Sequence, residues 1–421
     1  MRILVIAYEF PPIIAAQSLR WFYLTEELAR LGVEVHVLCP EFSALEAFPF
    51  AFNNKVTVHR TWPGPYVALS QSLAKKIDRS SSKWATDVIQ GPSLPQKIYQ
   101  SIRKFLDNLL FPDLRTEWYF FAKKSLRSLL NSYQFDALIS SYEPGVDLLL
   151  GLWAQKKYGV KWIVDLGDPI LAPYTPRWRR KIDSWFEKRV LERAERIVLT
   201  TDQIRPLLCK RHHLTNPSKF VCIPQGFPHH RFSTVRTDFA LPRGIMNIVF
   251  TGTFYRDFRS PTNFASALRA LKTNKIMTTL IGDNFEFISM FEGINNIKFI
   301  GKISHFECLA IQNKADLLLN IGNIQDYQVP GKIYEYIGAR KPILHIKTGM
   351  HDPGADLIEQ LHAGLVVFND PEKIGAALLS LVECWQDCQL STLYSADPGI
   401  VDHHSWAVRA NSFQNLLVAL S

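Results

Sequence analysis

The chain has 421 residues, a length that favours two domains over a single hydrophobic core. Hydrophobic residues make up 47% and charged residues 21%, which is a globular composition and excludes a disordered or low-complexity protein. The net charge is +9, and basic residues gather with aromatic ones in two regions, 75–127 and 177–196. Such regions are typical either of surface helices that rest on anionic lipid or of ordinary amphipathic helices with a solvated basic face. No nucleic-acid-binding motif accompanies them, so a nucleic-acid partner is not expected.

The six cysteines show neither a CxxC pair nor a zinc-type spacing with histidine, so we expect reduced thiols and a cytosolic compartment. The first residues, MRILVIAYEFPP, place a short apolar run after a basic residue, but Glu9, Pro11 and Pro12 interrupt it. A first β-strand is therefore a better interpretation than a signal peptide. No stretch approaches ~18 uninterrupted apolar residues, and no transmembrane helix is expected.

Short apolar strands alternate with helical patterns in the first half of the chain. Predicted strands lie at 2–8, 34–38, 136–140, 161–165, 196–200 and 220–223, and helices lie at 17–31, 145–158 and 177–194. A polar, proline-containing stretch at 225–243 interrupts this rhythm. Further strands are predicted at 247–251, 277–281, 297–300, 317–320, 342–345 and 364–367, and an amphipathic helix at 404–420. This βαβ repetition predicts two Rossmann-like α/β domains with doubly wound parallel sheets, joined near residue 235.

Ligands of such sheets bind outside the carboxyl ends of the strands, so the loops that follow strands are the places to look for a site. A dinucleotide-binding domain would show GxGxxG after a first strand. The loops here read EFPPIIAAQSLR and GTFYRDFRSP, and no Walker A sequence is present. Hydride transfer with NAD is therefore not expected.

The loop after the first strand leads through Ala15 and Ala16 into a helix that carries Arg20. Small residues at a helix start let backbone N–H groups approach an anion. The alternative is a rigid Pro-Pro turn without a ligand.

The loop after the strand at 247–251 begins with Gly252 and Thr253 and continues to Arg256 and Arg259. A guanidinium can bind a phosphate through two parallel hydrogen bonds. The alternative is that these arginines lie on the surface and pair with Asp257.

A third loop runs into a short helix in the sequence QVPGKIYEYIGARKPIL. If the helix begins at Gly331, its first N–H groups favour an anion, and Lys332 adds a positive charge beside them. Glu335 falls on the same face one turn later and is suited to accept hydrogen bonds from a diol such as ribose. The alternative is a local pair of Lys332 with Glu335, since they are three residues apart.

Taken together, these loops resemble the retaining glycosyltransferases of family 4, which have the two-domain GT-B fold, and in particular bacterial members of polysaccharide and lipopolysaccharide assembly. The segments that carry the resemblance are YEFPPIIAAQSLRWFYLTEELARLGVEVHVL, FPDLRTEWYFFA, FDALISS, WIVDLGDP, RAERIVLTT, CIPQGF, FTGTFYRDFRSP, FIGKISHFECLAIQNKADLLLNIG and VPGKIYEYIGARKPIL.

The resemblance implies an N-terminal acceptor-side domain at 1–235, completed by a C-terminal helix at 404–421, and a donor-binding domain at 236–403. Across a central cleft, the second domain would hold a UDP- or GDP-sugar. Arg259, with Arg256, would bind the diphosphate, Gly331 and Lys332 would assist, and Glu335 would bind the ribose. The loop around Ile303 resembles the segment that surrounds the base.

Two positions depart from the family pattern. The usual Glu-x7-Glu motif would place an acid at 327, where this chain has Tyr327, so the sugar is left open. The glycine-rich turn after the first strand is Ala15-Ala16, and alanine does not permit a positive φ at little cost.

Three acids at the ends of N-terminal strands are candidates for the catalytic group, namely Glu143, Asp168 and Glu9, and for each of them a structural or acceptor-orienting role is the favoured alternative. Retaining transfer through an oxocarbenium-like ion pair mainly requires stabilisation of the departing diphosphate. We expect no cofactor and no metal, because no DxD-type pair is present. The hypothesis is a cytoplasmic glycosyltransferase, peripheral at the inner face of the membrane, that extends a lipid-linked or polysaccharide acceptor with retention. The alternatives are a catalytically silent subunit that partners an active transferase and a sugar-nucleotide epimerase of the same architecture.

Overall fold

The structure is a computed structural model that describes residues 1–42, 52–68, 111–173, 175–214, 216–229, 236–271 and 273–420. Contacts divide the described chain into two compact units. Unit 1 holds the described residues up to Pro224 and those from Arg409 onward, and unit 2 holds Gln225–Val408. The joint predicted near residue 235 lies outside the described residues, as does the basic region from 75 to 110.

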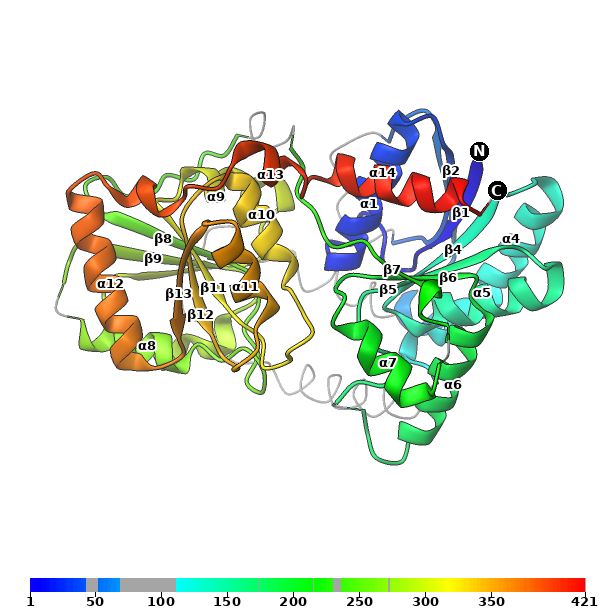
Figure 1. Ribbon diagram of the computed structural model, residues 1–421, viewed down its shortest axis with the longest axis horizontal. Coiled ribbons are helices and arrows are strands. Elements are labelled where there is room, and N and C mark those ends of the chain that lie inside the picture. Colours follow the sequence, from blue (N-terminus) through cyan, green and yellow to red (C-terminus); the bar gives the residue numbers. More distant parts are fainter. Residues whose placement is uncertain are drawn as a thin grey trace. The chain divides into compact units, whose positions relative to one another are not determined.

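Unit 1 is built on a parallel sheet with the strand order β3-β2-β1-β4-β5-β6-β7 (Figure 1). The strands are β1 (Arg2–Ile6), β2 (Glu34–Pro40), β3 (Val56–Thr61), β4 (Ala137–Tyr142), β5 (Trp162–Leu166), β6 (Arg196–Leu199) and β7 (Phe220–Cys222). Its helices are α1 (Ala16–Arg30), η2 (Leu114–Glu117), α4 (Trp118–Ser132), α5 (Gly145–Tyr158), α6 (Arg180–Arg193), α7 (Ile204–His212) and η3 (Pro217–Lys219).

Unit 2 repeats the architecture with the strand order β10-β9-β8-β11-β12-β13, again parallel throughout the described residues. The strands are β8 (Met246–Thr251), β9 (Ile276–Ile281), β10 (Ile297–Ile300), β11 (Leu317–Ile321), β12 (Ile343–Lys347) and β13 (Gly364–Phe368). The helices are α8 (Thr262–Ala270), η4 (Phe285–Phe291), α9 (His305–Lys314), α10 (Gly331–Ala339), α11 (Pro353–Gln360), α12 (Pro371–Gln386), η5 (Leu390–Leu393) and α13 (Pro398–Asp402).

The predicted fold class of two Rossmann-like parallel sheets is confirmed. Central strands are buried on both faces, as expected when helices cover a parallel sheet from both sides. Every residue of β8 and of β11 is buried, for example, and Leu319 of β11 belongs to the core of unit 2. The sequence prediction missed β3, whose segment VTVHRT is an edge strand with exposed positions and therefore lacks a continuous apolar run.

Strand order reverses direction at one point in each sheet, between β1 and β4 in unit 1 and between β8 and β11 in unit 2. The loops that leave the carboxyl ends of two such strands diverge to opposite faces and open a crevice. The loops after β1 and β4 carry Glu9 and Glu143, and the loop after β8 carries Arg259. The topology alone therefore brings candidate residues from distant parts of the chain to one edge of each sheet.

The last helix, α14 (Trp406–Val418), packs on unit 1. Phe413 contacts Trp21 of α1 edge to face, with ring centroids 5.4 Å apart, and Gln414 donates a hydrogen bond to the Leu31 carbonyl oxygen at 3.3 Å. The chain thus returns to its first unit after completing the second. All six cysteines are free thiols, as the spacing predicted.

Candidate functional site

The turn after β8 is held by a side chain from the loop that follows the neighbouring strand β9. Gly252 has φ +151°, a conformation that favours glycine, and its carbonyl oxygen accepts a 2.9 Å hydrogen bond from Asn284 Nδ2. Asn284 Oδ1 accepts from the Phe254 N–H at 2.8 Å, so the buried amide holds the turn on both sides. Between them Thr253 is half-buried, and its N–H has no acceptor among the described residues. An amide donor is therefore open at the carboxyl end of β8.

Arg259 lies in the same loop and does not pair with Asp257. Its Nε and Nη2 atoms donate to Asn323 Oδ1 at 2.9 and 2.7 Å, and Asn323 Nδ2 in turn donates to Gln328 Oε1 at 2.8 Å. These contacts tie the loop after β8 to the loop that leads into α10. Burial lowers the pKa of Arg259 from its ordinary value, because no carboxylate among the described residues neutralises the guanidinium. The site thus holds an uncompensated positive charge.

Arg256 is placed differently from Arg259. Its side chain is exposed, its Nε lies 3.8 Å from Glu286 Oε2, and its guanidinium lies over the Phe287 ring at 5.9 Å from the centroid. Such an exposed, loosely paired cation contributes little to a fixed site. The structure therefore does not join Arg256 to the cluster around Arg259, in contrast to the expectation.

Helix α10 begins at Gly331, as the sequence predicts, after Pro330 at the N-cap position. Pro330 has no side-chain donor or acceptor, and the N–H groups of Gly331 and Lys332 have no acceptor within the described chain. The neighbouring helix α9 differs, because Ser304 and Glu307 form a complete capping box there. The amino end of α10 is thus an open, positively polarised surface.

Glu335 is buried one turn into α10, in a polar network. Its Oε2 accepts from Lys332 Nζ at 2.6 Å and from Gln312 Nε2 at 3.1 Å, and Gln312 also donates to Thr251 Oγ1 at 2.8 Å. Burial alone would raise the pKa of Glu335, but Lys332 and the buried His305 outweigh it and lower that pKa. The local Lys332–Glu335 pair posed as an alternative is therefore present. The second carboxylate oxygen, Oε1, has His305 Nδ1 at 4.0 Å and keeps capacity to accept hydrogen bonds.

Ile303 and Tyr327 lie in the loops that flank this network. Ile303 is half-buried immediately before the Ser304 cap of α9, and Tyr327 is half-buried in the loop between β11 and α10. Both loops leave carboxyl ends of strands in unit 2, so the structure places these residues at the predicted edge of the sheet.

In unit 1 the loop after β1 ends in an extended Ala15, with φ −139° and ψ 165°. Helix α1 begins at the exposed Ala16 without a side-chain cap. Because neither residue has a positive φ, alanine fits this turn without strain. The departure from a glycine-rich turn therefore requires no unusual backbone conformation here.

Arg20 has a structural position rather than the ligand-facing one that we expected. Its side chain is completely buried and forms a two-pronged ion pair with Asp165, with Nε–Oδ2 at 2.8 Å and Nη2–Oδ1 at 2.9 Å. The same guanidinium also donates to the carbonyl oxygens of Ile223 and Pro224. Arg20 thus joins α1 to β5 and to the segment after β7, and it is not available to a phosphate. Helix spacing alone could not show which face would be buried.

A cavity of about 350 Å³ opens at the carboxyl edge of the unit 1 sheet. Its lining comprises Pro112, Asp113, Arg115, Tyr142, Glu143, Pro144, Gly145, Ile170, Ala172, Thr175, Pro176, Arg179 and Asp183. These residues come from loops after β4 and β5, from the segment before η2, and from the start of α6. This volume falls in the range of small-molecule sites.

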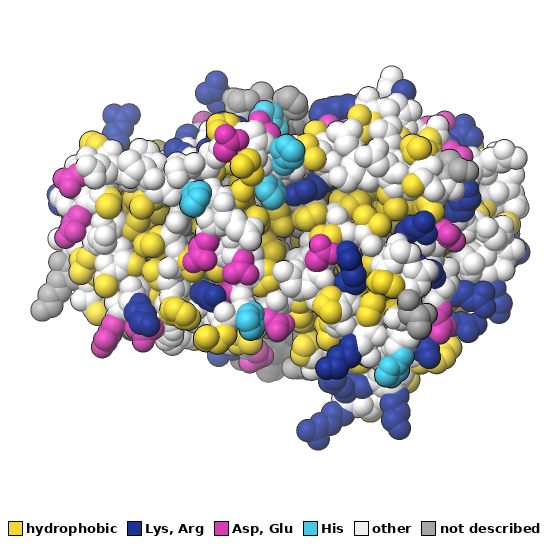
Figure 2. Space-filling view, in the orientation of Figure 1, with side chains coloured by type: hydrophobic (Ala, Val, Ile, Leu, Met, Phe, Trp, Pro, Cys, Tyr) yellow, Lys and Arg dark blue, Asp and Glu magenta, His cyan; other side chains and the backbone are white. Residues whose placement is uncertain are grey.

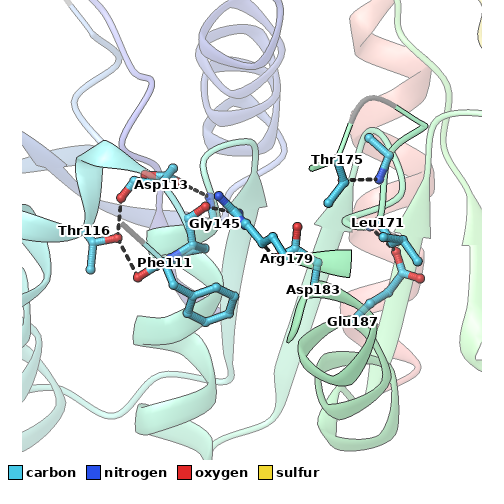
Figure 3. A network of polar contacts seen from close by, with 11 residues as sticks. Phe111, Asp113, Thr116, Gly145, Leu171, Thr175, Arg179, Asp183 and Glu187 are labelled. Carbon is cyan, nitrogen blue, oxygen red and sulfur yellow. Dashed lines mark hydrogen bonds and ion pairs between the residues drawn. The ribbon is translucent and has the colours of Figure 1, made fainter. Parts of the chain in front are cut away.

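Hydrogen bonds between these loops build the cavity wall (Figure 3). Asp113 accepts from the Arg115 N–H and from the Gly145 N–H, both at 2.8 Å, and so joins η2 to the start of α5. Arg179 is paired with Asp183 at 2.8 Å and also donates to the Pro112 carbonyl oxygen, which joins α6 to the same segment. Contacts within the protein therefore hold the wall together.

The loop after β5 is fixed by Glu187, a completely buried carboxylate of α6 (Figure 3). Glu187 accepts hydrogen bonds from the Leu171 N–H at 2.9 Å, from Arg211 Nη1 at 2.7 Å and from His212 Nε2 at 2.6 Å. Although burial would raise the pKa of Glu187, these donors outweigh it and lower that pKa. Because Leu171 lies between two lining residues, Glu187 positions this side of the cavity.

Of the three acids proposed from the sequence, Glu143 lines this cavity, whereas Asp168 and Glu9 are not among the lining residues but are close enough for their charges to act on Glu143. The pKa of Glu143 is raised to about 7, first by desolvation and then by the negative charge of Asp168, although the residue as a whole is exposed. Glu9 also raises it, while Arg115, paired with Glu9 at 3.1 Å, lowers it. A carboxyl group with a pKa near 7 is ionised in a substantial fraction of molecules at neutral pH and can exchange a proton with a hydroxyl group.

Sequence reasoning missed several residues that organise the two sites. Asn284 and Asn323 follow β9 and β11 and could have been noticed as polar residues after buried strands. The cavity residues Arg115, Arg179 and Glu187 gave no such signal, because they come from helices and turns whose contacts depend on the folded chain. Among the described residues no helix is long and apolar enough to cross a membrane, and no cluster of His, Cys, Asp and Glu is suited to a metal ion.

Comparison with known proteins agrees with this geometry. The glycosyl transferase 4-like domain family matches residues 18–226. No protein of curated function matches the sequence.

Among solved structures, sucrose-phosphate synthase from Thermosynechococcus elongatus is similar, with 14% identity, a TM-score of 0.69, and coverage of 100% of this chain and 98% of that one. Anabaena HepE in complex with UDP-glucose has 13% identity and a TM-score of 0.62, and both chains are covered completely. WaaG, a glycosyltransferase involved in lipopolysaccharide biosynthesis, has 12% identity and a TM-score of 0.57, with 98% of this chain and 95% of that one covered. Residues 18–226 thus match a glycosyl transferase 4-like domain, and the chain, with its two parallel Rossmann-like sheets, has the GT-B fold of these solved glycosyltransferases.

Proposed function

We propose that the protein transfers a sugar from a nucleoside-diphosphate sugar to a hydroxyl group of a lipid-linked or polysaccharide acceptor, with retention of the anomeric configuration. The observation that carries the donor assignment is Arg259, a half-buried residue whose guanidinium has no carboxylate partner among the described residues. Burying such a charge is costly unless an anion compensates for it. A diphosphate supplies that anion.

The donor would be held by unit 2. The diphosphate would bind Arg259, the open N–H groups of Thr253, Gly331 and Lys332, and the amino end of α10. At this end each favourable charge is worth about 0.3–1 kcal/mol when exposed and up to about 2 kcal/mol when partly buried. Departure of the nucleoside diphosphate increases the negative charge at this position, so the same groups stabilise the transition state more than the ground state.

The nucleoside would be recognised by α10 and the loop before α9. Glu335 Oε1 can accept hydrogen bonds from the ribose diol while Oε2 remains bound to Lys332 and Gln312. The loop at Ile303 would contact the base. Tyr327, which stands where relatives carry an acid, would face the transferred sugar and contribute to its selection.

The acceptor would enter the cavity of unit 1. Ionised Glu143 would accept the proton of the attacking hydroxyl as its oxygen bonds to the anomeric carbon and the bond to the diphosphate breaks on the same face. Asp168 and Glu9 would keep the pKa of Glu143 high enough for this transfer and orient acceptor hydroxyl groups. No covalent sugar–enzyme intermediate is required by this scheme.

Calorimetric titration with UDP and with 2′,3′-dideoxy-UDP tests the donor assignment. Wild-type protein should bind UDP about tenfold more tightly than the dideoxy compound, because hydrogen bonds to a charged group contribute about 1.5–3 kcal/mol. Glu335→Gln should remove most of this difference, whereas Glu286→Gln, an exposed acid of the same unit, should preserve it. Equal discrimination by Glu335→Gln and wild type would contradict the ribose assignment. If UDP does not bind, the same titration with GDP decides the base.

Product analysis tests the reaction. Incubation with UDP- or GDP-sugars and extracted acceptor lipids should yield a glycoside with the anomeric configuration of the donor, visible in the proton coupling of the anomeric position. Slow release of nucleotide without acceptor would argue against a silent subunit. Inversion at the anomeric carbon would refute retention, and a donor epimerised without acceptor would identify an epimerase.

A further inference from the structure

The outward face of α6 exposes large apolar side chains. Trp178, in the turn before the helix, is 56% exposed, and Ile182 and Trp185 on the helix are 42% and 61% exposed. Steps of four and three residues place them on one stripe along the helix. We refer to these three residues as the α6 stripe.

The opposite face of α6 already satisfies the fold of unit 1. Phe186, Val190 and Leu191 are buried there, and Glu187 holds the network with Leu171 and α7. The helix is therefore fixed in the unit through its inner face. The α6 stripe adds nothing to that core, and its exposure has no explanation in the packing of the unit.

Cations surround the α6 stripe. The exposed ones are Arg177, Arg180, Lys181, Lys188 and Arg193. Lys188 lies 3.9 Å from Glu192, and the other four have no carboxylate partner within the described chain. Lys and Arg side chains project from the end of the unit that carries α6 and α7 (Figure 2). The surface is thus apolar in the middle and positive around it.

This combination fits the surface of an anionic bilayer. Tryptophan is favoured in the head-group region because its ring is apolar and its N–H is polar, and lysine and arginine stems can extend toward lipid phosphates. A branched aliphatic residue at the centre of the stripe favours acyl chains over nucleic-acid bases, which stack on aromatic rings and guanidinium groups. Charge complementarity and the apolar stripe therefore select the same partner.

The α6 stripe also adjoins the cavity of unit 1. Arg179 and Asp183 line the cavity and are the next residues in sequence after Trp178 and Ile182 of the stripe. Pro176, which also lines the cavity, lies two residues before Trp178. On the proposed function, a lipid anchored in the bilayer at the α6 stripe would present its head group near the cavity. A protein partner on the stripe would have no such relation to an acceptor.

We propose that the α6 stripe and the cations around it dock the protein on bilayers that contain anionic phospholipids, with Trp178, Ile182 and Trp185 entering the head-group region. The surface would hold the protein peripherally, and it does not require that a sugar be transferred.

Vesicle flotation of the full chain, without nucleotide sugar or acceptor, tests the docking surface. Wild-type protein should float with vesicles of phosphatidylcholine and phosphatidylglycerol at low salt, and much less at high salt or with phosphatidylcholine alone. Trp178→Ser/Trp185→Ser and Lys181→Glu/Lys188→Glu should each weaken binding at least about tenfold, since one cation at an anionic surface contributes roughly fivefold.

Phe368→Ser is the matched control. Phe368 is 49% exposed in unit 2 with the lysines Lys347 and Lys373 close to its ring, and its loss should leave flotation unchanged. Circular dichroism and nucleotide titration of every variant report folding separately.

The proposal fails if the wild type does not float, or if the α6 variants bind as well as the wild type. The proposal also fails if the single substitution Phe120→Ser on α4 abolishes vesicle binding while the α6 variants still bind, because the docking surface would then lie on α4. If the tryptophan variant changes the molar mass in light scattering but not flotation, the stripe is a protein interface instead. None of these outcomes bears on sugar transfer, which the assay does not measure.

Discussion

The two sheets of this protein share one architecture but present opposite charges at their carboxyl edges. In unit 2 the carboxyl edge holds Arg259, which has no carboxylate partner among the described residues, and an open helix end, while the buried acid Glu335 is already paired with Lys332. In unit 1 the cavity is lined by the acids Asp113, Glu143 and Asp183, and desolvation, followed by the negative charge of Asp168, raises the pKa of Glu143. The carboxyl edge of unit 2 is suited to bind an anion, and that of unit 1 is suited to bind a hydroxyl group and accept its proton. The fold thus fixes where ligands bind, and the loop residues decide which ligands they are.

The largest effect should come from Glu143→Gln. If Glu143 accepts the acceptor proton, transfer should fall by about 10²–10⁴-fold, while UDP affinity stays at the wild-type level. The wild-type rate should rise with pH as Glu143 ionises through a pKa of about 7, and this rise should be absent in the variant. Initial rates across pH check both points. An unchanged pH profile in Glu143→Gln would assign the base elsewhere, and Asp168→Asn is then the next variant to measure.

Glu187→Ala should destabilise the protein by about 3–5 kcal/mol, because it leaves Arg211 and His212 beside an empty buried position. Since folding lowers the pKa of Glu187 from 4.5, its contribution to stability is complete above that value and is lost as the pH falls through the lower, folded-state pKa.

Urea unfolding of wild type and variant at neutral and acidic pH measures this effect. Glu192→Ala on the exposed face of α6 is the control and should change stability by less than about 0.5 kcal/mol. If the two variants are equally stable, the Glu187 network does not hold the cavity wall.

Arg259→Ala should weaken UDP binding by about 10–100-fold, which corresponds to roughly 1.5–3 kcal/mol for hydrogen bonds to a charged group. Arg256→Ala is a matched change in the same loop and should cost less than about threefold, because its guanidinium is exposed and loosely paired. Calorimetric titration compares them directly. Equal losses for both arginines would show that the loop rearranges on binding and brings Arg256 to the diphosphate.

The smallest effect is expected for Ala15→Gly. Ala15 has an extended backbone, so the ability of glycine to adopt a positive φ brings no advantage at this position. The substitution should lower the free energy of unfolding by less than about 1 kcal/mol, because glycine makes the unfolded chain more flexible. Donor affinity and transfer rate should remain within about twofold of wild type. A large gain in rate would mean that the loop after β1 adopts a positive φ during the reaction, and would revise the structural account of this turn.

The fold class, every strand except β3, the loops that hold Glu9, Glu143 and Arg259, and the helix that holds Glu335 could all be predicted from the sequence. These features depend on local patterns, namely apolar runs, helix starts and strand ends, which are readable without the tertiary structure. β3 was not predicted, because it is an edge strand with exposed polar positions and therefore shows only a weak hydrophobic pattern.

The tertiary structure was needed to show which charged residues are paired with an opposite charge inside the protein and which are not. Arg20 and Arg259 each lie in a loop or helix that follows a strand, yet Arg20 is buried against Asp165, whereas Arg259 has the neutral amide of Asn323 as its hydrogen-bond partner among the described residues. Likewise, Glu187 and the cavity that it supports arise from residues far apart in the chain. The physical reason is that the partner of a charge is set by contacts between distant segments, and the compensation of that charge, rather than its presence, determines whether it can bind an anion.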